Sequence, residues 1–251
     1  MCLLVLAYKV HPDYPFLFVG NRDEFLDRPT QAADWWDDHP DVFAGRDLRA
    51  GGTWTGINKK GNFAALTNWR DGHDNKGSRS RGDLVVDFLT ADKAPAEYIY
   101  SKRPVEKDYN KFNLLLGLPN SLYYYSNAGE EGSRKLRGNS IYGLSNGKIN
   151  SSWPKVNKAK KFMRDLVRKP GFQPDDLFNM MTDKGQARDQ HLPNTNIPYR
   201  WEKTLSAMFI DTPEYGTMVT TVIAVDKHGK MIMEERGHKP PGQSRRAQIN
   251  L

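Results

Sequence analysis

The sequence contains a single cysteine, Cys2, among 251 residues. One cysteine cannot form an internal disulfide, so nothing indicates an oxidising compartment, and we expect a cytoplasmic location. Long hydrophobic runs are missing as well. The apolar stretch from Leu3 to Ala7 lacks a preceding positive segment and is far shorter than the roughly 20 residues that span a bilayer. We therefore expect neither a signal peptide nor a membrane span.

Nucleic-acid-binding motifs are also missing, although the formal net charge is +7 at pH 7. Many cations fall in the stretch 155–169, whose apolar residues recur at helical spacing. This spacing is typical of an amphipathic surface helix with its cations in solvent, so we expect no nucleic-acid partner. The cations of this stretch are Lys155, Lys158, Lys160, Lys161, Arg164, Arg168 and Lys169.

The composition and length are those of a globular protein. Apolar residues make up 38% of the chain and charged residues 27%, which excludes a disordered chain. This length is enough for one large domain with a substantial core, so we expect a single domain over residues 1–251. The Pro/Gly-rich segment 237–242 predicts a loose tail over residues 237–251.

Strand-like runs occur in pairs separated by turn residues, and helical segments occur in pairs between them. Such blocks are buried economically as two mostly antiparallel sheets packed face to face with helices outside. The sequence therefore predicts an α/β (α+β) fold, a four-layer αββα sandwich. The predicted strands are 2–10, 16–20, 53–58, 63–68, 112–118, 121–126, 207–211, 219–226 and 231–235, and the predicted helices are 80–89, 96–102, 155–168 and 175–182.

The position of Cys2 directly after Met1 gives it a chemical use. Removal of Met1 would place a thiol and a free α-amine on one residue. The thiolate is the nucleophile, and an α-amine with a pKa of about 8 can accept the thiol proton, directly or through water. A small buried core residue is the alternative interpretation of a free cysteine.

A polar run, Asn21 to Glu24, ends the second predicted strand, which is the hairpin partner of the first. Its side chains should therefore lie close to Cys2. Arg22 would lower the pKa of the thiol, and Asp23 could hold the α-amine by a charge-assisted hydrogen bond. The alternative is an ordinary turn with a surface ion pair.

A series of longer motifs runs along nearly the whole chain. They are Met1-Cys2, Asn21 to Phe25 with Arg28-Pro29, Gly51 to Trp54, Ala64 to Asn68, Arg81-Gly82, Phe112 to Leu114, Tyr142 to Asn146 with Trp153 to Lys155, and Tyr215 to Thr217. In this order they resemble the NRDE family, also called transport and Golgi organisation 2. That family is similar to N-terminal-nucleophile (Ntn) hydrolases such as penicillin V acylase and bile salt hydrolase. The resemblance implies an Ntn-hydrolase-like fold.

The resemblance also implies residue roles. Cys2 matches the nucleophile, and Arg22 and Asp23 fall where the acylases keep an arginine and an aspartate beside it, with Glu24 as an alternative carboxylate. Asn68 and Asn146 match the segments that supply oxyanion-hole donors. An amide N–H aimed at a developing oxyanion stabilises it without adding a titrating group. Turn capping is the alternative role of both asparagines.

The remaining site predictions concern binding. Many family members have an arginine after Tyr-Gly-Thr, where this sequence has Met218. Either Arg22 or Arg200 could supply the missing charge, and Met218 itself favours an apolar pocket. Tryptophans could line such a pocket, although aromatic residues more often belong to a core; they are Trp35, Trp36, Trp54 and Trp69. The predicted binding residues are Asn21, Glu24, Trp54, Trp69 and Met218.

Two functions follow from the residues and the resemblance. The first is a cysteine Ntn-type hydrolase that cleaves a carbon–nitrogen bond of a small non-peptide amide and requires no cofactor. The second is a non-catalytic protein that binds or traffics haem or a hydrophobic ligand, with Cys2 on the haem iron. A purely structural or interaction protein is a third possibility. We predict no metal site, because the histidines show no ligand spacing; they are His11, His39, His73, His191, His228 and His238.

Overall fold

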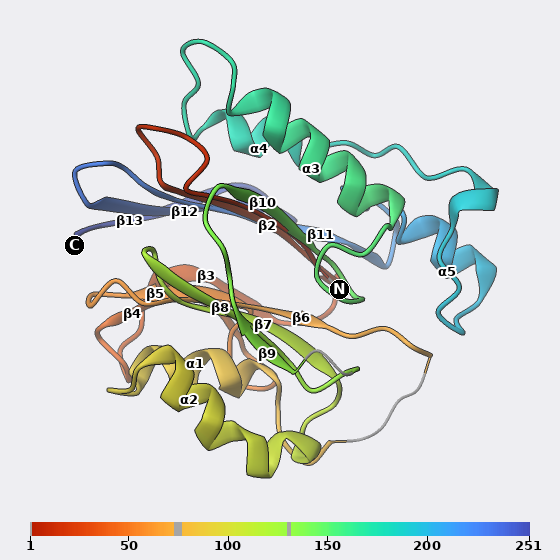
Figure 1. Ribbon diagram of the computed structural model, residues 1–251. Helices are drawn as coiled ribbons and strands as arrows, with labels where there is room; N and C mark the ends of the chain where they lie inside the picture. The colour runs from red at the N-terminus through yellow and green to blue at the C-terminus, as the bar shows by residue number, and fades with distance from the viewer. Residues whose placement is uncertain (1, 73–76, 130–131) are drawn as a thin grey trace.

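Two antiparallel sheets lie face to face between two layers of helices in the computed structural model (Figure 1). The structure describes residues 2–72, 77–129 and 132–251. The strand pairings between neighbours in both sheets are antiparallel. The predicted four-layer αββα sandwich is confirmed.

The first sheet, here called sheet A, has six strands in the order β10-β1-β2-β11-β12-β13. Its strands are β1 (Cys2–Tyr8), β2 (Phe16–Phe25), β10 (Ser140–Leu144), β11 (Tyr215–Val225), β12 (Lys230–His238) and β13 (Pro241–Asn250). The helices α3 (Pro154–Leu166) and α4 (Asp176–Met180) cover its outer face, and α5 (Tyr199–Thr204) lies beside it (Figure 1).

The second sheet, sheet B, has seven strands in the order β3 to β9. Its strands are β3 (Thr30–Trp35), β4 (Val42–Asp47), β5 (Thr55–Asn58), β6 (Phe63–Asn68), β7 (Phe112–Leu118), β8 (Ser121–Ser126) and β9 (Ser133–Lys135). The helices α1 (Gly82–Thr90) and α2 (Pro95–Lys102) cover its outer face. Short 3-10 helices, η1 (Arg103–Asp108) and η2 (Asp189–His191), occur in the connections.

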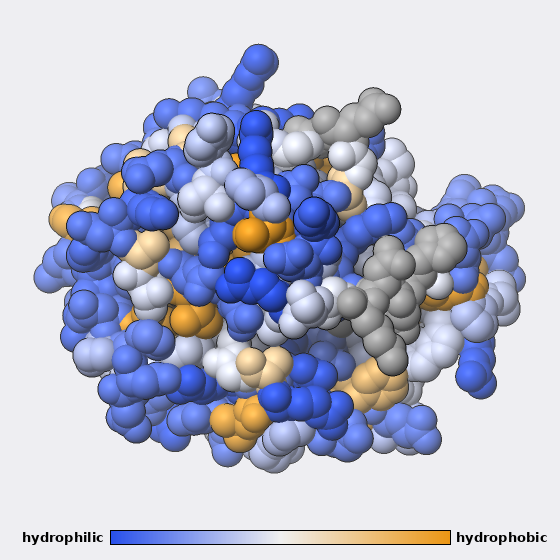
Figure 2. Space-filling model, turned by 90° about the horizontal axis from the view of Figure 1, so that it is seen from below, coloured by the Kyte–Doolittle hydropathy of each residue, from blue (hydrophilic) through white to orange (hydrophobic). Residues whose placement is uncertain are grey.

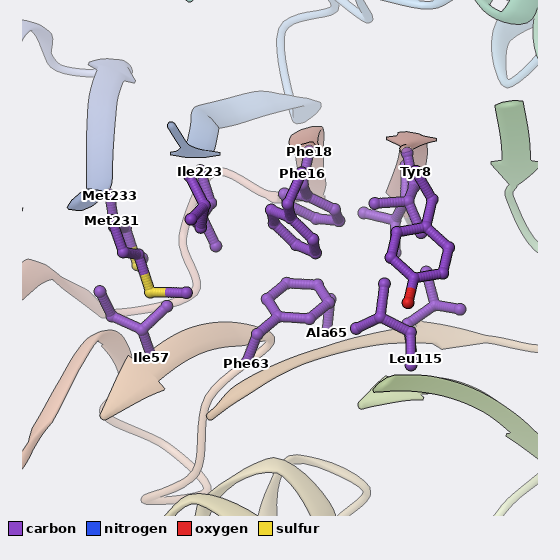
Figure 3. Packing of buried hydrophobic residues seen from close by; sticks show 14 of the residues in the cluster. Tyr8, Phe16, Phe18, Ile57, Phe63, Ala65, Leu115, Ile223, Met231 and Met233 are labelled. Carbon is purple, nitrogen blue, oxygen red and sulfur yellow. The ribbon is translucent and has the colours of Figure 1, made fainter. Parts of the chain in front are cut away.

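Alternation along the strands divides the core into layers, because successive side chains of a strand point to opposite faces. Leu4 and Leu6 of β1 belong to the cluster between the sheets, whereas Leu3 and Val5 pack against α3 and α4. Aromatic rings, aliphatic side chains and methionines together fill the space between the sheets (Figure 3). There the ring of Phe63 from sheet B lies 5.2 Å from that of Phe16 and 4.9 Å from that of Phe18.

Two predictions about the chain's course are wrong. Residues 237–251 are not a loose tail, since most of them form β13, which pairs with β12 along its length. Ala247 of β13 is buried in the core between the sheets, and Ile249 packs against it. The predicted strand at 207–211 is reduced to an isolated antiparallel bridge between Asp211 and Gly216, and the backbone N–H of Ile210 donates to the hydroxyl of Thr217 instead of to a strand carbonyl.

The surface features agree with a polar exterior. Figure 2 shows the face on which α1 and α2 lie; among its described residues, hydrophobic side chains form small separate patches in a mostly hydrophilic surface. Across residues 2–72, 77–129 and 132–251, no helix is long and apolar enough to cross a membrane.

Candidate functional site

The pairing of β1 with β2 places Cys2 directly opposite Arg22. Cys2 belongs to the cluster between the sheets. Residues that pair across two neighbouring strands point to the same face of a sheet, and successive residues along β2 point to opposite faces. Arg22 therefore points to the cleft side of sheet A, where its guanidinium lies 4.3 Å from the ring centre of Trp54. Asp23 points to the opposite face, under the helices.

A cleft of about 380 Å³ opens beside Cys2 and Arg22. This volume suits a small-molecule ligand. Most of its wall is polar and charged. The walls include Cys2, Arg22, Asp23, Glu24, Arg28, Asp47, Trp54, Leu66, Asn68, Arg79 and Arg81. Four of the residues predicted from sequence to be catalytic, and two of those predicted to bind, thus border one cavity.

Arg22 is fixed on several sides. Its Nη2 lies 3.6 Å from Asp47 and 3.9 Å from Glu24, and the side chain is 5% exposed. Asp47 also accepts a 2.6 Å hydrogen bond from Nε of Arg28. Within the described residues, Nη1 of Arg22 has no hydrogen-bond partner. The guanidinium is therefore oriented by stacking and ion pairs while one of its donors stays available.

The thiol of Cys2 is buried, at 8% exposure. Burial raises the pKa of Cys2, the Asp23 charge raises it further, and Arg22 and a backbone hydrogen bond from Asp23 lower it only in part. The prediction that Arg22 lowers the pKa is correct for its own contribution, but burial outweighs that contribution. The thiol is held protonated and needs a base when it reacts.

Asp23 is buried on the helix side, at 1% exposure. One of its carboxylate oxygens accepts a 2.7 Å hydrogen bond from the hydroxyl of Thr217, and its backbone carbonyl accepts one from Tyr215. Burial raises the pKa of Asp23, while the charge of Lys155 lowers it more than that of Arg22 does. The carboxylate therefore depends on nearby positive charge to stay ionised.

Lys155 is the residue that the sequence interpretation misplaced. It was predicted on the solvated face of its helix, yet it is 3% exposed, in the first turn of α3. Burial lowers the pKa of Lys155 to about 8, and the charges of Asp23 and Cys2 oppose this shift by raising it. Helical periodicity predicts which apolar residues of a helix face the sheet. It does not predict that a lysine in the first turn of α3 is buried. Its place in the Trp153 to Lys155 motif was the available signal.

The two asparagines have different positions. Asn68 ends β6 and lines the cleft. Asn146 is fully buried and is not among the cleft residues. Its amide donates a 2.8 Å hydrogen bond to the backbone carbonyl of Asn68. Asn146 is itself contacted by the hydroxyl of Ser145, which also donates to the Cys2 carbonyl at 2.9 Å.

Three of the predicted binding residues lie away from the cleft. Asn21 is buried under the helices, where its amide donates to the carbonyls of Met181 and Met208. Trp69 is half-buried outside the cleft. Met218 occupies a bulge of β11 between the partners of Asp23 and Arg22, and packs against Trp54. A bulge redirects side chains, and Met218 lines a separate cavity of about 230 Å³.

Other predicted residues fall elsewhere. Trp35 packs against the core between the sheets, and Trp36 donates to the carbonyl of Ala44. Arg200 is exposed on α5 and so does not replace the missing arginine. Met1 and His73 lie outside the described residues. In the described part of the chain, no group of three or more His, Cys, Asp or Glu side chains could hold a metal ion.

Two solved structures that resemble this one are N-terminal-nucleophile hydrolases. A Caenorhabditis elegans orthologue of N-acylethanolamine-hydrolyzing acid amidase has a TM-score of 0.51 at 12% identity, covering 88% of this chain and 92% of that one. A mutant conjugated bile acid hydrolase from Clostridium perfringens has a TM-score of 0.54 at 8% identity, covering 100% and 92%. The chain therefore has an Ntn-hydrolase-like fold.

Sequence comparison identifies closer relatives. The transport and Golgi organization protein 2 homologues of Bos taurus and Homo sapiens are 32% and 30% identical to this chain, each over 94% of it and 92% of the relative. The family model described as Transport and Golgi organisation 2 matches residues 1–240. The chain belongs to the Transport and Golgi organisation 2 family.

Proposed function

We propose that this protein is a cysteine hydrolase that cleaves the carbon–nitrogen bond of a small non-peptide amide. The observation that carries the proposal is the position of Cys2 at the start of β1, in the wall of a ligand-sized cleft opposite Arg22. In the first step, the Cys2 sulfur attacks the amide carbonyl, and the amine leaves with a proton. In the second step, water cleaves the thioester, which releases the carboxylic acid and restores the thiol.

The base in this mechanism is the α-amine that removal of Met1 would expose on Cys2. The buried thiol is protonated at rest, so a group next to it has to accept its proton during the attack. No described histidine lines the cleft beside Cys2. An α-amine with an ordinary pKa of about 8 has the right affinity for this proton, and Asp23, next to the partner of Cys2 in β2, is the proposed group that orients it.

Asn68 is the proposed oxyanion donor. It borders the cleft that contains Cys2, and a neutral amide N–H can stabilise the negative oxygen of the tetrahedral intermediate by roughly 3 kcal/mol. Asn146 positions this donor, because its amide donates a hydrogen bond to the backbone carbonyl of Asn68. Arg22 adds a fixed positive charge on the same side of the sheet.

The cleft fits an amide with polar or charged groups better than a haem. Its walls carry Arg22, Arg28, Glu24 and Asp47, whereas its apolar side chains are few. A porphyrin needs broad apolar walls around its rings, and the buried thiol of Cys2 is held in its protonated form, not in the thiolate form that binds iron. The residues of the cleft therefore do not fit haem ligation by Cys2.

Amide hydrolysis by the purified protein tests the proposal. The probes are an N-acylethanolamine and a conjugated bile acid, the amides that the structurally similar enzymes are named for, followed by a set of short N-acyl amides. We expect the protein to release the free acid, and we expect Cys2→Ser to lower the rate of release by at least about 1000-fold. The matched control is Lys161→Met, an exposed residue of α3. Equal release by the protein and by Cys2→Ser would contradict the proposal.

A further inference from the structure

The side chain of Lys155 is a buried cation for which the proposed reaction has no stated use. It is 3% exposed, and its Nζ makes no hydrogen bond within the described part of the chain. Removing an ammonium from water costs several kcal/mol unless nearby charge offsets the loss. The surroundings of Lys155 therefore have to contain a compensating negative group.

The charges of four groups, on β1, β2, α5 and the segment after β6, influence the protonation of the buried Lys155. Asp23 of β2, Cys2 of β1 and Glu202 of α5 favour its charged form, and Arg70, which follows β6, opposes it. Among them, Asp23 has the largest effect. In return, Lys155 is the side chain whose charge most favours the ionised form of Asp23.

Glu202 already forms an ion pair and hydrogen bonds with residues other than Lys155. Its carboxylate lies 2.8 Å from Nη2 of Arg70, and it accepts hydrogen bonds from the backbone N–H and the hydroxyl of Thr195 at 2.7 and 2.5 Å. Arg70 in turn stacks 4.6 Å from the ring centre of Trp153. The pair Arg70–Glu202 is therefore close to neutral as a unit, which leaves Asp23 as the charge that matches Lys155.

We propose that Lys155 is a positioning residue of the Cys2 site: its buried ammonium holds Asp23 as a carboxylate, and Asp23 orients the α-amine that accepts the thiol proton. The second half of this inference rests on the proposed function. The coupling between Lys155 and Asp23 does not. Lys155 thus supplies a cation from the helix side of sheet A, whereas Met218 occupies the position of the arginine that the family resemblance implies.

The titration behaviour supports this arrangement. Burial lowers the pKa of Lys155 to about 8 and raises the pKa of Asp23. Each group therefore needs the other to stay charged. Lys155 loses its proton, and with it the attraction to Asp23, as the pH rises through about 8. The free energy of unfolding nevertheless rises with pH above about 8, because the unfolded chain keeps this lysine proton to higher pH than the folded protein does.

A double-mutant cycle tests the coupling. Lys155→Met leaves Asp23 without its cation, so we expect the Tm at pH 7.5 to fall by about 10 °C. Asp23→Asn in the same protein should recover at least half of that loss, because it removes the buried charge. The loss caused by Lys155→Met should also shrink at pH 5, where the unpaired carboxyl takes up a proton. Lys161→Met, on the exposed side of α3, should change the Tm by less than about 2 °C.

Three outcomes would overturn the inference. The first is a pair of Tm losses that simply add in the double mutant, which shows that the residues are independent. The second is a loss that is the same at pH 5 and pH 7.5, which points to packing. If Lys155→Met does not fold, the double mutant has to fold at pH 7.5; a double mutant that also fails to fold is the third contradicting outcome.

Turnover gives a second, separate readout. With an amide substrate in hand, Lys155→Met should lower kcat by at least about 30-fold with KM within about threefold, and Lys155→Arg should restore part of the rate because it keeps the charge. An unchanged kcat in Lys155→Met would contradict the positioning role. Absence of hydrolysis by the unmodified protein would count against the proposed function alone, because the stability cycle still decides whether Lys155 and Asp23 are coupled.

Discussion

Asp23 and Glu235 are two buried carboxylates on opposite faces of sheet A. Asp23 lies under the helices and accepts a hydroxyl hydrogen bond from Thr217, and the charge of Lys155 lowers its pKa. Glu235 lies between the sheets and accepts hydrogen bonds from the backbone N–H of Ala33 and the hydroxyl of Thr221. Their exposures are nearly equal, at 1% and 2%. They differ in the cation that acts on them: for Asp23 the strongest positive charge is that of Lys155, whereas for Glu235 it is that of Arg22.

This difference decides what each carboxylate can do. Burial raises the pKa of Glu235 to about 7, and neutral donors together with the charge of Arg22 offset this only in part. Such a group exchanges its proton near neutral pH and serves best as a hydrogen-bonded link between strands. A carboxylate beside a buried ammonium can remain charged and hold a second amine. Asp23 is therefore suited to remain charged, and Glu235 to exchange its proton near neutral pH.

A third buried carboxylate, Glu202, shows the largest expected effect on stability because it has a direct ion-pair partner. Nη2 of Arg70 lies 2.8 Å from the carboxylate of Glu202, which is 4% exposed. Arg70→Met removes this cation and leaves a buried carboxylate without its ion-pair partner. We expect the free energy of unfolding to fall by about 3 to 5 kcal/mol, as for other buried pairs that lose one member. Urea unfolding at pH 7 measures it. A loss below about 1 kcal/mol would show that Lys155 or water compensates Glu202 fully.

Activity should separate Asp23 from Glu235. Asp23→Asn removes the charge that orients the proposed α-amine base, so amide hydrolysis should fall by at least about 100-fold. Glu235→Gln is the matched change on the other face of the sheet and should alter the rate by less than about threefold. Steady-state kinetics on both variants, with circular dichroism to check folding, provides the measurement. Similar losses in the two variants would remove the distinction.

Stability should depend on pH through Glu235. The folded-state pKa of about 7 exceeds the ordinary value of 4.5, so the folded protein binds this proton more tightly than the unfolded chain does. The contribution of Glu235 to the free energy of unfolding is therefore fully present below about pH 4.5. It falls by roughly 2 to 3 kcal/mol as the pH rises to 7. Urea unfolding between pH 5 and 8 should show the decline, and Glu235→Gln should flatten it. An equally steep decline in the variant would exclude Glu235 as its source.

An exposed ion pair gives the smallest expected effect. Nζ of Lys60 lies 2.8 Å from Asp92, and both side chains are in solvent. Water screens such pairs, so Lys60→Met should leave the Tm within the error of calorimetry. A clear drop in Tm would mean that surface charges contribute more to this fold than the comparison of buried carboxylates implies.

Much of the fold follows from alternation and turn chemistry. The hairpins β1–β2, β5–β6, β7–β8 and β11–β12 form where the paired runs predict them. One strand that the sequence did not predict, β13, carries a weak apolar pattern. β13 is an edge strand rich in charged and polar residues that buries only Ala247 fully, so its composition resembles that of a tail. Edge strands are commonly charged for this reason.

The site was predicted on its cleft side and missed on its helix side. Hairpin pairing places Cys2 opposite Arg22, as the paired strands predicted, and both border the same cleft as Asn68, while the roles of the three residues stay predictions. Lys155 could not be assigned in this way, since its burial depends on how α3 lies over sheet A. Met218 was expected in the ligand pocket, but the bulge in β11 directs it to Trp54.

The central claim is that the Cys2 thiol is the nucleophile and works beside a free α-amine. Intact-mass spectrometry of the protein purified from its own cells, before and after brief exposure to an amide substrate and acid quenching, tests it most directly. The account predicts a mass that lacks one methionine and a single added acyl group, which is absent in Cys2→Ala. A retained Met1 together with an unmodified thiol would contradict it.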